Sequence, residues 1–329
     1  MAGTAPAHTA PIPALTGQEP FFVVLNAGSG REDARAVQRT IAGVLGRAGR
    51  RHEIRVVLHP QELERTARRV VEQARRERGV VVAAGGDGTL NAVAQLVLGA
   101  GLPFGILPQG TFNYFGRAYG IPADAERAAH ALLDAVVRPV QVGLLNGRAF
   151  LVNASVGLYP QLLEDREAYK QRFGRSRMVA LWSGLATLLR PPRQLHLELD
   201  VEAGQTRTLR TPTLVVGNNL LQLERVGIEE AEALERSRLV AMTVRPVGTL
   251  ALYGLLIRGA FSRLGEADNV SSFDFSCMRV RGPRASRPRR FKVAMDGEIS
   301  WLPAPLEFKV APHPLPLLVP RHADPADRA

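Results

Sequence analysis

Short apolar runs alternate with helical segments up to about residue 138, and few folds accommodate that order. The strand-like runs are Phe21–Leu25, Ile54–Leu58, Val80–Ala84 and Phe104–Leu107. Helical periodicity covers Arg31 to about Ala48, Gln61–Arg78 and Leu90–Leu98. Strands connected by helices pair in parallel, because the helix returns the chain to the starting edge of the sheet. We therefore expect a doubly wound α/β domain, with a parallel sheet and helices on both faces, over residues 21–138.

A different pattern begins near residues 135–140, where short strands follow one another with turn signals between them. Asn146-Gly147 is the strongest of these signals, because both residues tolerate the positive φ angles of a two-residue hairpin loop. The expected strands are Val140–Leu144, Ala149–Ala154, Leu195–Val201, Thr206–Leu209, Leu214–Val216, Leu239–Val244, Phe273–Val280, Phe291–Met295 and Leu306–Val310. This pattern predicts an antiparallel β-sandwich domain over residues 139–320. Residues 1–20 and 321–329 are expected to be disordered tails.

Composition narrows the classes of function. Lys and Arg outnumber Asp and Glu by 42 to 31, which gives a net charge of +11. This excess favours phosphate-bearing partners, although an arginine-rich composition can also reflect genomic bias. The single cysteine, Cys277, excludes an internal disulfide and a CxxC metal site, and we expect it to be a small buried side chain in the strand Phe273–Val280. No run of 18 apolar residues and no signal-peptide pattern occurs, so we expect a cytoplasmic protein.

The run Val80–Ala84 leads directly into the turn Gly85-Gly86-Asp87-Gly88-Thr89. Glycines after a buried strand let the backbone approach a ligand closely, and the amides of the turn and of the next helix can then bind an anion. Thr89 can cap that helix or bind a phosphate oxygen, and Asn91 adds an amide side chain. Asp87 would repel phosphates unless a divalent cation lay between them, so the loop suits a magnesium nucleotide. The alternative is a tight turn capped by Asp87.

Two further loops fit the same site. Asn26-Ala27-Gly28-Ser29-Gly30, followed by Arg31, comes after the first strand, and Gly110-Thr111-Phe112-Asn113 comes after the fourth. Loops at the carboxyl ends of parallel strands converge on one crevice, so we expect these loops to bind ATP with Mg²⁺. Other phosphate motifs are missing from the sequence. Asp33 stands where GxGxxG needs its third glycine, and neither GxxxxGK[ST] nor GxSxG occurs.

Three of these segments resemble the diacylglycerol kinase catalytic-domain family: NAGSG at Asn26–Gly30, GGDGTLN at Gly85–Asn91 and LPQGTFNYFGR at Leu107–Arg117. The likeness extends over about Phe21–Pro320. It implies an α/β nucleotide domain and a β-sandwich, with ATP in the cleft and the lipid presented nearby. It also implies a lipid kinase of phospholipid metabolism, which transfers the γ-phosphate of ATP to a hydroxyl of diacylglycerol or a related lipid.

In that family a DGE segment of the sandwich domain faces the nucleotide, and here the segment is Asp296-Gly297-Glu298. The resemblance implies that Glu298 is the catalytic base and that Asp296 supports it. Asp87 would position Mg²⁺, with a base role for Asp87 as the alternative. Phosphoryl transfer to an alcohol needs an acceptor for the hydroxyl proton, and a carboxylate at a strand end can supply it. Asp-Gly alone is only a common turn.

The sequence departs from the family pattern at several positions. Ala27 replaces the proline of NPxSG, Ala92 replaces the glutamate after GGDGTxN, and Tyr114 replaces the aspartate of GTxNDF. The last two changes remove carboxylates near the nucleotide. Many bacterial members bind a structural Mg²⁺ through a DDG segment, and the nearest match is Glu235-Arg236-Ser237. Arg236 cannot act as a Mg²⁺ ligand, so we expect that this structural metal site is absent.

Two segments suit contact with an anionic membrane. Met178–Leu189 is an apolar helix with Trp182 and basic flanks, although it could equally be a core helix. Arg279–Lys292 holds seven basic residues and could instead be a solvated loop. A further helix is expected at Thr249–Leu264. We expect peripheral association with the inner face of the membrane and no nucleic-acid partner, because aromatic residues do not interleave with the basic run.

Two other functions stay open on the sequence. NAD kinase shares GGDGT on a related nucleotide domain, although the DGE segment and the apolar helix with basic ends favour a lipid. A membrane-binding regulatory protein with weak or no turnover is the third possibility, because Ala92 and Tyr114 remove two carboxylates.

Overall fold

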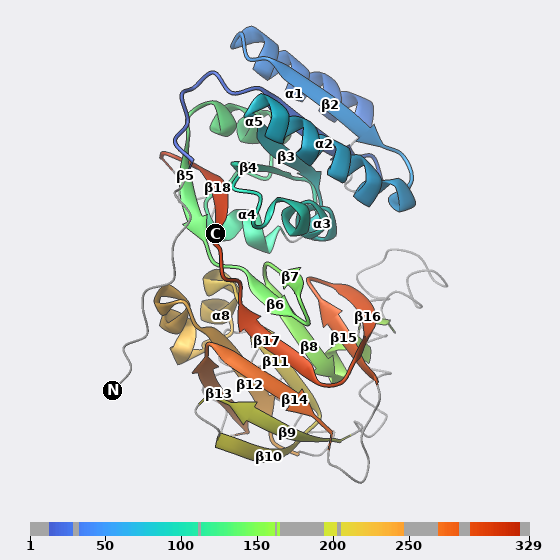
Figure 1. Ribbon diagram of the computed structural model, residues 1–329, viewed down its shortest axis with the longest axis vertical. Helices are drawn as coiled ribbons and strands as arrows, with labels where there is room; N and C mark the ends of the chain where they lie inside the picture. The colour runs from blue at the N-terminus through green and yellow to red at the C-terminus, as the bar shows by residue number, and fades with distance from the viewer. Residues whose placement is uncertain are drawn as a thin grey trace. The chain divides into compact units, whose positions relative to one another are not determined.

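The structure is a computed structural model, and it describes residues 13–28, 33–110, 113–161, 163–164, 194–202, 205–246, 269–282 and 290–322. The chain divides into two compact units, whose elements are labelled in Figure 1. Unit 1 comprises residues 1–142 and 311–329, and unit 2 comprises residues 143–310.

Unit 1 is built on a six-stranded sheet in the order β2-β1-β3-β4-β18-β5. The strands are β1 (Phe21–Asn26), β2 (His52–Val57), β3 (Val80–Gly85), β4 (Phe104–Pro108), β5 (Ala135–Val140) and β18 (Leu315–Pro320). The helices are α1 (Ala34–Arg47), α2 (Leu63–Glu77), α3 (Asp87–Val97), α4 (Tyr114–Ala118) and α5 (Ala125–Leu133), with a 3-10 turn η1 (Pro60–Glu62) before α2. All strand pairs in this sheet are parallel except β18 with β5. The predicted α/β class is confirmed.

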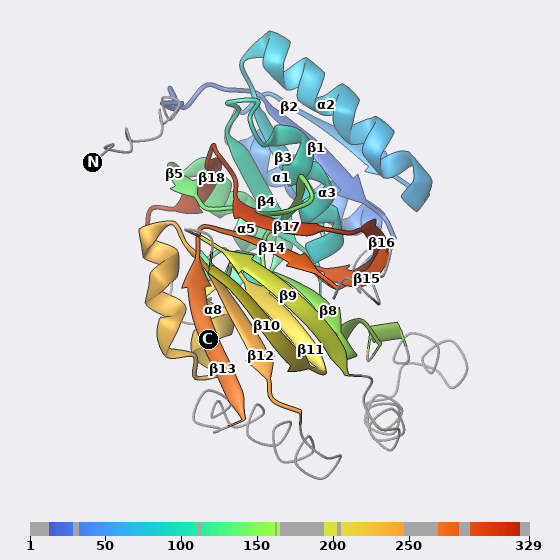
Figure 2. The same cartoon turned by 60° about the horizontal axis from the view of Figure 1, so that its bottom comes forward.

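Helices cover both faces of this sheet, as the alternation of side chains in each strand requires. Phe21, Val23 and Leu25 of β1 belong to one core cluster with the buried residues of α1 and α5. The intervening residues Phe22 and Val24 are also buried, so they face the opposite side. That side is covered by α2 and α3, which contact each other and the strands β1 and β3 (Figure 2).

Unit 2 contains two six-stranded antiparallel sheets, in the orders β10-β9-β14-β17-β6-β7 and β13-β12-β11-β8-β15-β16. Its strands are β6 (Gly143–Leu145), β7 (Arg148–Phe150), β8 (Asn153–Gly157), β9 (Leu195–Val201), β10 (Gln205–Thr211), β11 (Thr213–Gly217), β12 (Leu239–Val244), β13 (Val270–Phe275), β14 (Cys277–Arg281), β15 (Arg290–Met295), β16 (Glu298–Pro303) and β17 (Leu306–Val310). A short helix α8 (Leu220–Arg225) and a 3-10 helix η2 (Glu229–Arg236) connect β11 to β12.

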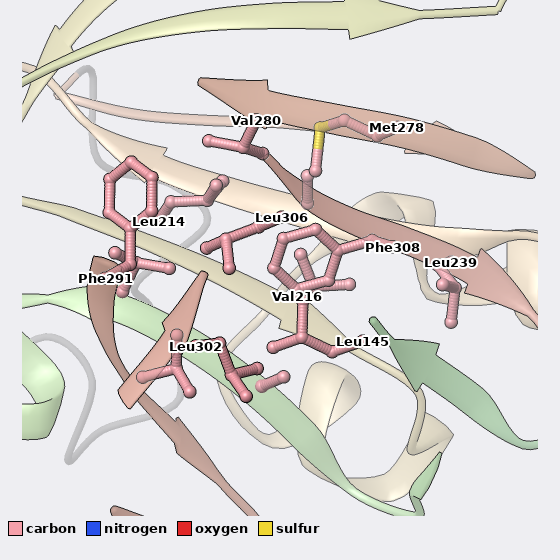
Figure 3. Packing of buried hydrophobic residues seen from close by; sticks show 14 of the residues in the cluster. Leu145, Leu214, Val216, Leu239, Met278, Val280, Phe291, Leu302, Leu306 and Phe308 are labelled. Carbon is pink, nitrogen blue, oxygen red and sulfur yellow. The ribbon is translucent and has the colours of Figure 1, made fainter. Parts of the chain in front are cut away.

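One core cluster joins the two sheets of unit 2. Met278 and Phe308 come from the first sheet, and Leu214, Val216 and Phe291 come from the second. Figure 3 shows these side chains packed together. Two antiparallel sheets that share one apolar core form a β-sandwich, as the sequence predicts. The predicted Asn146-Gly147 hairpin is also present, with φ angles of 49° and 79° between the paired residues Leu145 and Arg148.

Two predicted strands are in fact divided. Val140–Leu144 is split between β5 of unit 1 and β6 of unit 2, and Phe273–Val280 is split between β13 and β14 at Ser276. In the second case the chain leaves one sheet of the sandwich and enters the other, while Phe275 and Met278 both reach the shared core. A continuous apolar run therefore did not indicate a continuous strand. Cys277, at this crossing, is partly exposed rather than buried.

The ends of the units differ from the predicted boundaries. The chain passes into unit 2 after Val142, and it returns to unit 1 at Ala311, whose amide donates to the carbonyl of Val142 (2.8 Å). The strand β18 therefore belongs to the α/β sheet and not to the sandwich that was predicted to extend to residue 320. At the amino end, Pro20 was assigned to a tail, yet its carbonyl accepts from the amide of Val80 (2.9 Å).

The expected helices Met178–Leu189 and Thr249–Leu264 lie outside the described residues, as does the middle of the basic segment Arg279–Lys292. Among the residues that are described, no helix combines the length and the apolar character needed to cross a bilayer.

Candidate active site

Three turns meet at the carboxyl ends of β1, β3 and β4. Asn26, the last residue of β1, donates from Nδ2 to Oγ1 of Thr89 in α3 (2.8 Å). The amide of Gln109, directly after β4, donates to the carbonyl of Gly85 at the end of β3 (2.9 Å). The described parts of the three loops, which the sequence places at one site, are therefore in contact within unit 1.

Glycine is required where two of these turns touch. A Cβ at Gly85 would lie 2.6 Å from the Cβ of Thr89. A Cβ at Gly110 would lie 2.9 Å from Oδ1 of Asn113 and 3.2 Å from the Cα of Gly86. The turn after β3 and the turn after β4 therefore approach each other at backbone distance, which only glycine permits.

Helix α3 begins inside the GGDGT turn, at Asp87, three residues earlier than the sequence predicts. Its N-cap residue is Gly86, which has extended geometry and no side chain to cap the first amides. The amides of the first turn therefore lie at the carboxyl edge of the sheet, beside the Asp87 carboxylate. Gly88 and Asn91 follow in the first two turns.

Thr89 is not the helix cap that the sequence allowed for. Its side chain is 5% exposed and lies in the first turn of α3, where its hydroxyl accepts from Asn26. This bond joins the end of β1 to the start of α3. Asn26 also accepts at Oδ1 from the amide of Gly28 (3.1 Å), which shapes the first residues of the following loop.

Four residues of the predicted site, Ser29, Gly30, Arg31 and Thr111, lie outside the described residues. Asn113 is described and is the N-cap of the short helix α4, in left-handed geometry with φ of 48°. Its side chain is 5% exposed, and its Oδ1 has no hydrogen-bond partner within the described parts of the chain.

The DGE segment forms the tip of the β15–β16 hairpin in unit 2. Asp296 and Gly297 have φ angles of 45° and 88° and connect the paired residues Met295 and Glu298. Asp-Gly with both φ angles positive is a tight hairpin loop. The carboxylate of Asp296 accepts three backbone hydrogen bonds, from the amides of Leu151 (2.7 Å), Val152 (2.8 Å) and Asn153 (3.0 Å).

These bonds fix the hairpin tip to the corner between β7 and β8. The amide of Asp296 also donates to the carbonyl of Asn153 (2.9 Å), so the contact is made in both directions. Charge-assisted bonds to backbone amides are stronger than neutral ones. The geometry therefore gives Asp296 a structural part in holding the strand that begins with Glu298.

A cluster of buried amide side chains surrounds this corner, and sequence reasoning did not find it. Asn153 donates to Oε1 of Gln222 (2.9 Å), and Asn218 donates from Nδ2 to the carbonyl of Leu151 (3.2 Å). Asn219 caps α8 by accepting from the amide of Gln222 (2.9 Å). Asn153 and Asn218 each follow an apolar run in the sequence, as Asn26 does. This position is the sequence feature that could have indicated the cluster.

Glu298 is exposed at the hairpin tip, on the first residue of β16. Desolvation by the surrounding protein raises the pKa of its carboxyl, the nearby charge of Asp296 raises it further, and Arg148 acts in the opposite direction. Arg148, on β7, also lies near β16, with Nη1 3.4 Å from Oγ of Ser300. A carboxyl with a raised pKa is a better proton acceptor than an ordinary glutamate.

Among the described residues, no group of three or more His, Cys, Asp or Glu side chains is arranged to hold a metal ion. Asp87, the first residue of α3, offers a carboxylate, which is a ligand type that Mg²⁺ prefers. Arg236 lies in the segment that corresponds to the structural Mg²⁺ site of the family. It is the last residue of η2 and is exposed.

The protein thus consists of an α/β unit, in which glycine-containing turns meet at one edge of the parallel sheet, and an antiparallel sandwich unit. Residues 20–145 match the model of the diacylglycerol kinase catalytic domain. This match confirms, for residues 20–145, the resemblance that was inferred from the motifs.

Individual relatives agree with this assignment. A YegS-like lipid kinase of Pseudomonas aeruginosa is 42% identical over 140 residues, which is 42% of this chain and 43% of that protein. A diacylglycerol kinase of Bacillus subtilis is 40% identical over 97 residues, 29% of this chain and 32% of that protein. The chain thus spans less than half the length of these curated relatives. A solved diacylglycerol kinase structure from Bacillus anthracis has a TM-score of 0.69 and 19% identity, covering 94% of this chain and 98% of that one, which shows the shared fold.

Proposed function

We propose that this protein is an ATP- and Mg²⁺-dependent lipid kinase, which phosphorylates a hydroxyl of diacylglycerol or a related lipid. The observation that carries the proposal is the junction of the β1, β3 and β4 turns, in which Asn26 bonds to Thr89 and Gly86 lies against Gly110. This junction falls inside the region that matches the kinase catalytic domain. The names of the relatives support a lipid as the acceptor.

The nucleotide phosphates are proposed to bind the start of α3. The first-turn amides of an 11-residue helix and its dipole favour an anion at this end. The backbone proposed to bind the phosphates includes the glycines of the three turns, Gly28, Gly85, Gly86, Gly88 and Gly110. The remaining proposed contacts are Asn26, Ser29, Gly30, Arg31, Thr89, Asn91, Thr111 and Asn113. ATP supplies the phosphoryl group, and Mg²⁺, held with the help of Asp87, neutralises its charge.

Glu298 is proposed as the base that takes the proton of the lipid hydroxyl. The raised pKa of its carboxyl favours this proton transfer. Asp296 is proposed as a positioning residue, because its carboxylate is already bound to three backbone amides. We propose that the protein acts at the cytoplasmic face of an anionic membrane, to which it binds peripherally.

Transfer of labelled phosphate tests this function. The purified protein is incubated with γ-labelled ATP, Mg²⁺ and a panel of diacylglycerol, ceramide and sphingosine in mixed micelles, with NAD in a parallel reaction. Label should appear in a lipid, and Glu298→Gln should lower kcat by about 10²–10⁴-fold. Asp87→Asn should weaken ATP binding and turnover in Mg²⁺. Matched controls are the exposed carboxylates Asp134→Asn in unit 1 and Glu224→Gln in unit 2.

Two results would overturn the proposal. Label in NADP with unlabelled lipid would make the protein an NAD kinase. Binding of ATP without transfer to any acceptor, with Glu298→Gln indistinguishable from the unchanged protein, would make it a regulatory protein.

A further inference from the structure

Two of the three large apolar side chains that are exposed among the described residues lie on one strand. Ile299 is 37% exposed and Trp301 is 52% exposed, and both belong to β16. The third, Leu58, follows β2 in unit 1. The strand β16 is the edge of its sheet and pairs only with β15 in that sheet (Figure 1). The edge strand therefore carries a small exposed apolar patch, which consists of Ile299 and Trp301.

Side-chain alternation separates the two faces of the β15–β16 hairpin. Phe291, Val293 and Leu302 face the sandwich core. The other face carries the cross-strand pairs Arg290 with Pro303, Lys292 with Trp301, and Ala294 with Ile299. The two exposed apolar side chains therefore share one face with two cations.

The cations are held close to the tryptophan. Nζ of Lys292 lies 5.4 Å from the centre of the Trp301 ring and donates to Glu164 (2.6 Å), which offsets part of its charge. Arg290 donates from Nη2 to the carbonyl of Trp301 (2.9 Å) and forms no ion pair with the described residues. By contrast, Arg279 and Arg281 of the same basic segment form ion pairs with Glu307 and Asp200.

We propose that this face of the hairpin, defined by Arg290, Lys292, Ile299 and Trp301, is the surface with which the protein docks on an anionic lipid bilayer. The proposal rests on the lipid-kinase function proposed above and assigns its membrane contact. Tryptophan prefers the boundary between headgroups and acyl chains, and isoleucine gains from leaving water. The two cations suit the negative surface potential of the bilayer.

The same strand carries the proposed base. Glu298 directly precedes Ile299 on β16. Glu298 pairs with Met295, which faces the sandwich core, so the side chains of Glu298 and Ile299 lie on opposite faces of the strand. A hairpin that docks through Ile299 and Trp301 would hold the backbone of Glu298, the neighbouring residue, near the lipid surface, with its carboxyl on the side that faces away from the docking contact. Binding and proton transfer would then be linked by one rigid element.

A second copy of the chain is a less suitable occupant of this edge. Pro303 on the edge strand β16 lacks the amide that pairing with a second copy of the strand would use. A patch of two exposed apolar side chains is also smaller than the interface that a stable dimer needs. We therefore commit to the lipid bilayer and leave the dimer as an outcome of the test.

Co-sedimentation with vesicles, without ATP, tests the surface. The protein should bind phosphatidylcholine vesicles that contain phosphatidylglycerol more tightly than pure phosphatidylcholine vesicles. Trp301→Ser should weaken binding about ten-fold or more, because a largely buried aromatic contact is lost. Arg290→Gln and Lys292→Gln should each weaken it up to about five-fold, and only on anionic vesicles. Leu58→Ser and Arg65→Gln are matched controls, since both residues are exposed in unit 1.

A second measurement locates the contact. The sequence has two tryptophans, Trp182 and Trp301, so Trp182→Phe leaves Trp301 as the only tryptophan fluorophore. Its emission should shift to the blue on anionic vesicles. Unchanged emission, or equal effects of Trp301→Ser and Leu58→Ser on binding, would overturn the proposal, as would a concentration-dependent dimer in light scattering that Trp301→Ser abolishes.

Turnover separates this proposal from the proposed function. With a water-soluble short-chain diacylglycerol, Trp301→Ser should keep the rate of the unchanged protein, whereas with diacylglycerol in vesicles it should lose most of it. Equal loss on both substrates would refute a docking role. If the protein binds vesicles through Trp301 but phosphorylates no lipid, the docking surface is supported and the proposed kinase function is refuted.

Discussion

Thr89 occupies the space in which a side chain at position 85 would lie, and this pair shows how single residues shape the candidate site. The closeness follows from the tight turn between β3 and α3, in which Leu90 donates to the carbonyl of Gly86 (3.0 Å). Thr89 also receives the bond from Asn26, so Gly85 affects the attachment of β1 to α3 indirectly. The residues of the turn are thus constrained by packing as well as by any ligand.

Gly85→Ala should destabilise the protein by about 1–3 kcal/mol, because the added methyl group would overlap Thr89. The control is Gly43→Ala in α1, where the new Cβ would meet only Nη1 of Arg47 at 3.5 Å. That change should stabilise by about 0.5–1 kcal/mol, since alanine favours a helix. Urea unfolding of both variants gives the comparison, and a neutral Gly85→Ala would contradict the packing argument.

Glu298 allows a prediction about pH. A base must be deprotonated, and the pKa of Glu298 is raised, mainly by desolvation. Turnover should therefore decline, as the pH falls, at a higher pH than an ordinary glutamate would give. Arg148 lowers this pKa, so Arg148→Gln should move the acidic limb of kcat/KM to still higher pH. A pH profile that does not move, with Arg65→Gln as the reference variant, would argue against Glu298 as the base.

At the scale of elements, the β15–β16 hairpin combines three features that the sequence shows only in part. Its tip is tied to the β7–β8 corner through Asp296, one face packs in the sandwich core, and the other carries Trp301. The Asp-Gly turn was visible in the sequence. The partner corner was not, because Leu151 and Asp296 are 145 positions apart.

Asp296→Asn should destabilise the protein by about 1.5–3 kcal/mol, because the carboxylate that accepts three backbone amides loses its charge and one acceptor oxygen. Asparagine tolerates the positive φ of this turn, so the change isolates the hydrogen bonds. Asp134→Asn, in an exposed position, should have little effect. Unfolding curves and hydrogen exchange at residues 151–153 measure the difference. Undiminished protection there would show that Asp296 does not hold the corner.

On the scale of the whole molecule, unit 2 is an insertion within unit 1. The strand β18 returns between β4 and β5, and its residues Leu315 and Leu317 are fully buried. The bond between Ala311 and Val142 closes the insertion at its base. The α/β sheet is therefore complete only when the carboxyl-terminal strand has been made.

A chain in which Val142 is joined to Ala311 by a short glycine linker should fold as an isolated α/β unit, since the two ends already touch. A chain that stops at Val142 lacks β18 and should not form a stable unit, because the edge of β4 and its apolar neighbours would be exposed. Circular dichroism and the cooperativity of thermal unfolding distinguish the two. Equal stability would show that β18 is dispensable.

The sequence by itself determined the class of each domain, the positions of most strands and the glycine turns that follow β1, β3 and β4. These are local properties, set by periodicity and by backbone freedom at single residues such as Gly85 and Asn146. Only the tertiary structure decided that β18 completes the first sheet, that Phe275 and Cys277 belong to different sheets, and that Asp296 holds the corner at Leu151. Those contacts join distant segments, and long-range pairing depends on burial and register that leave no fixed spacing in the chain.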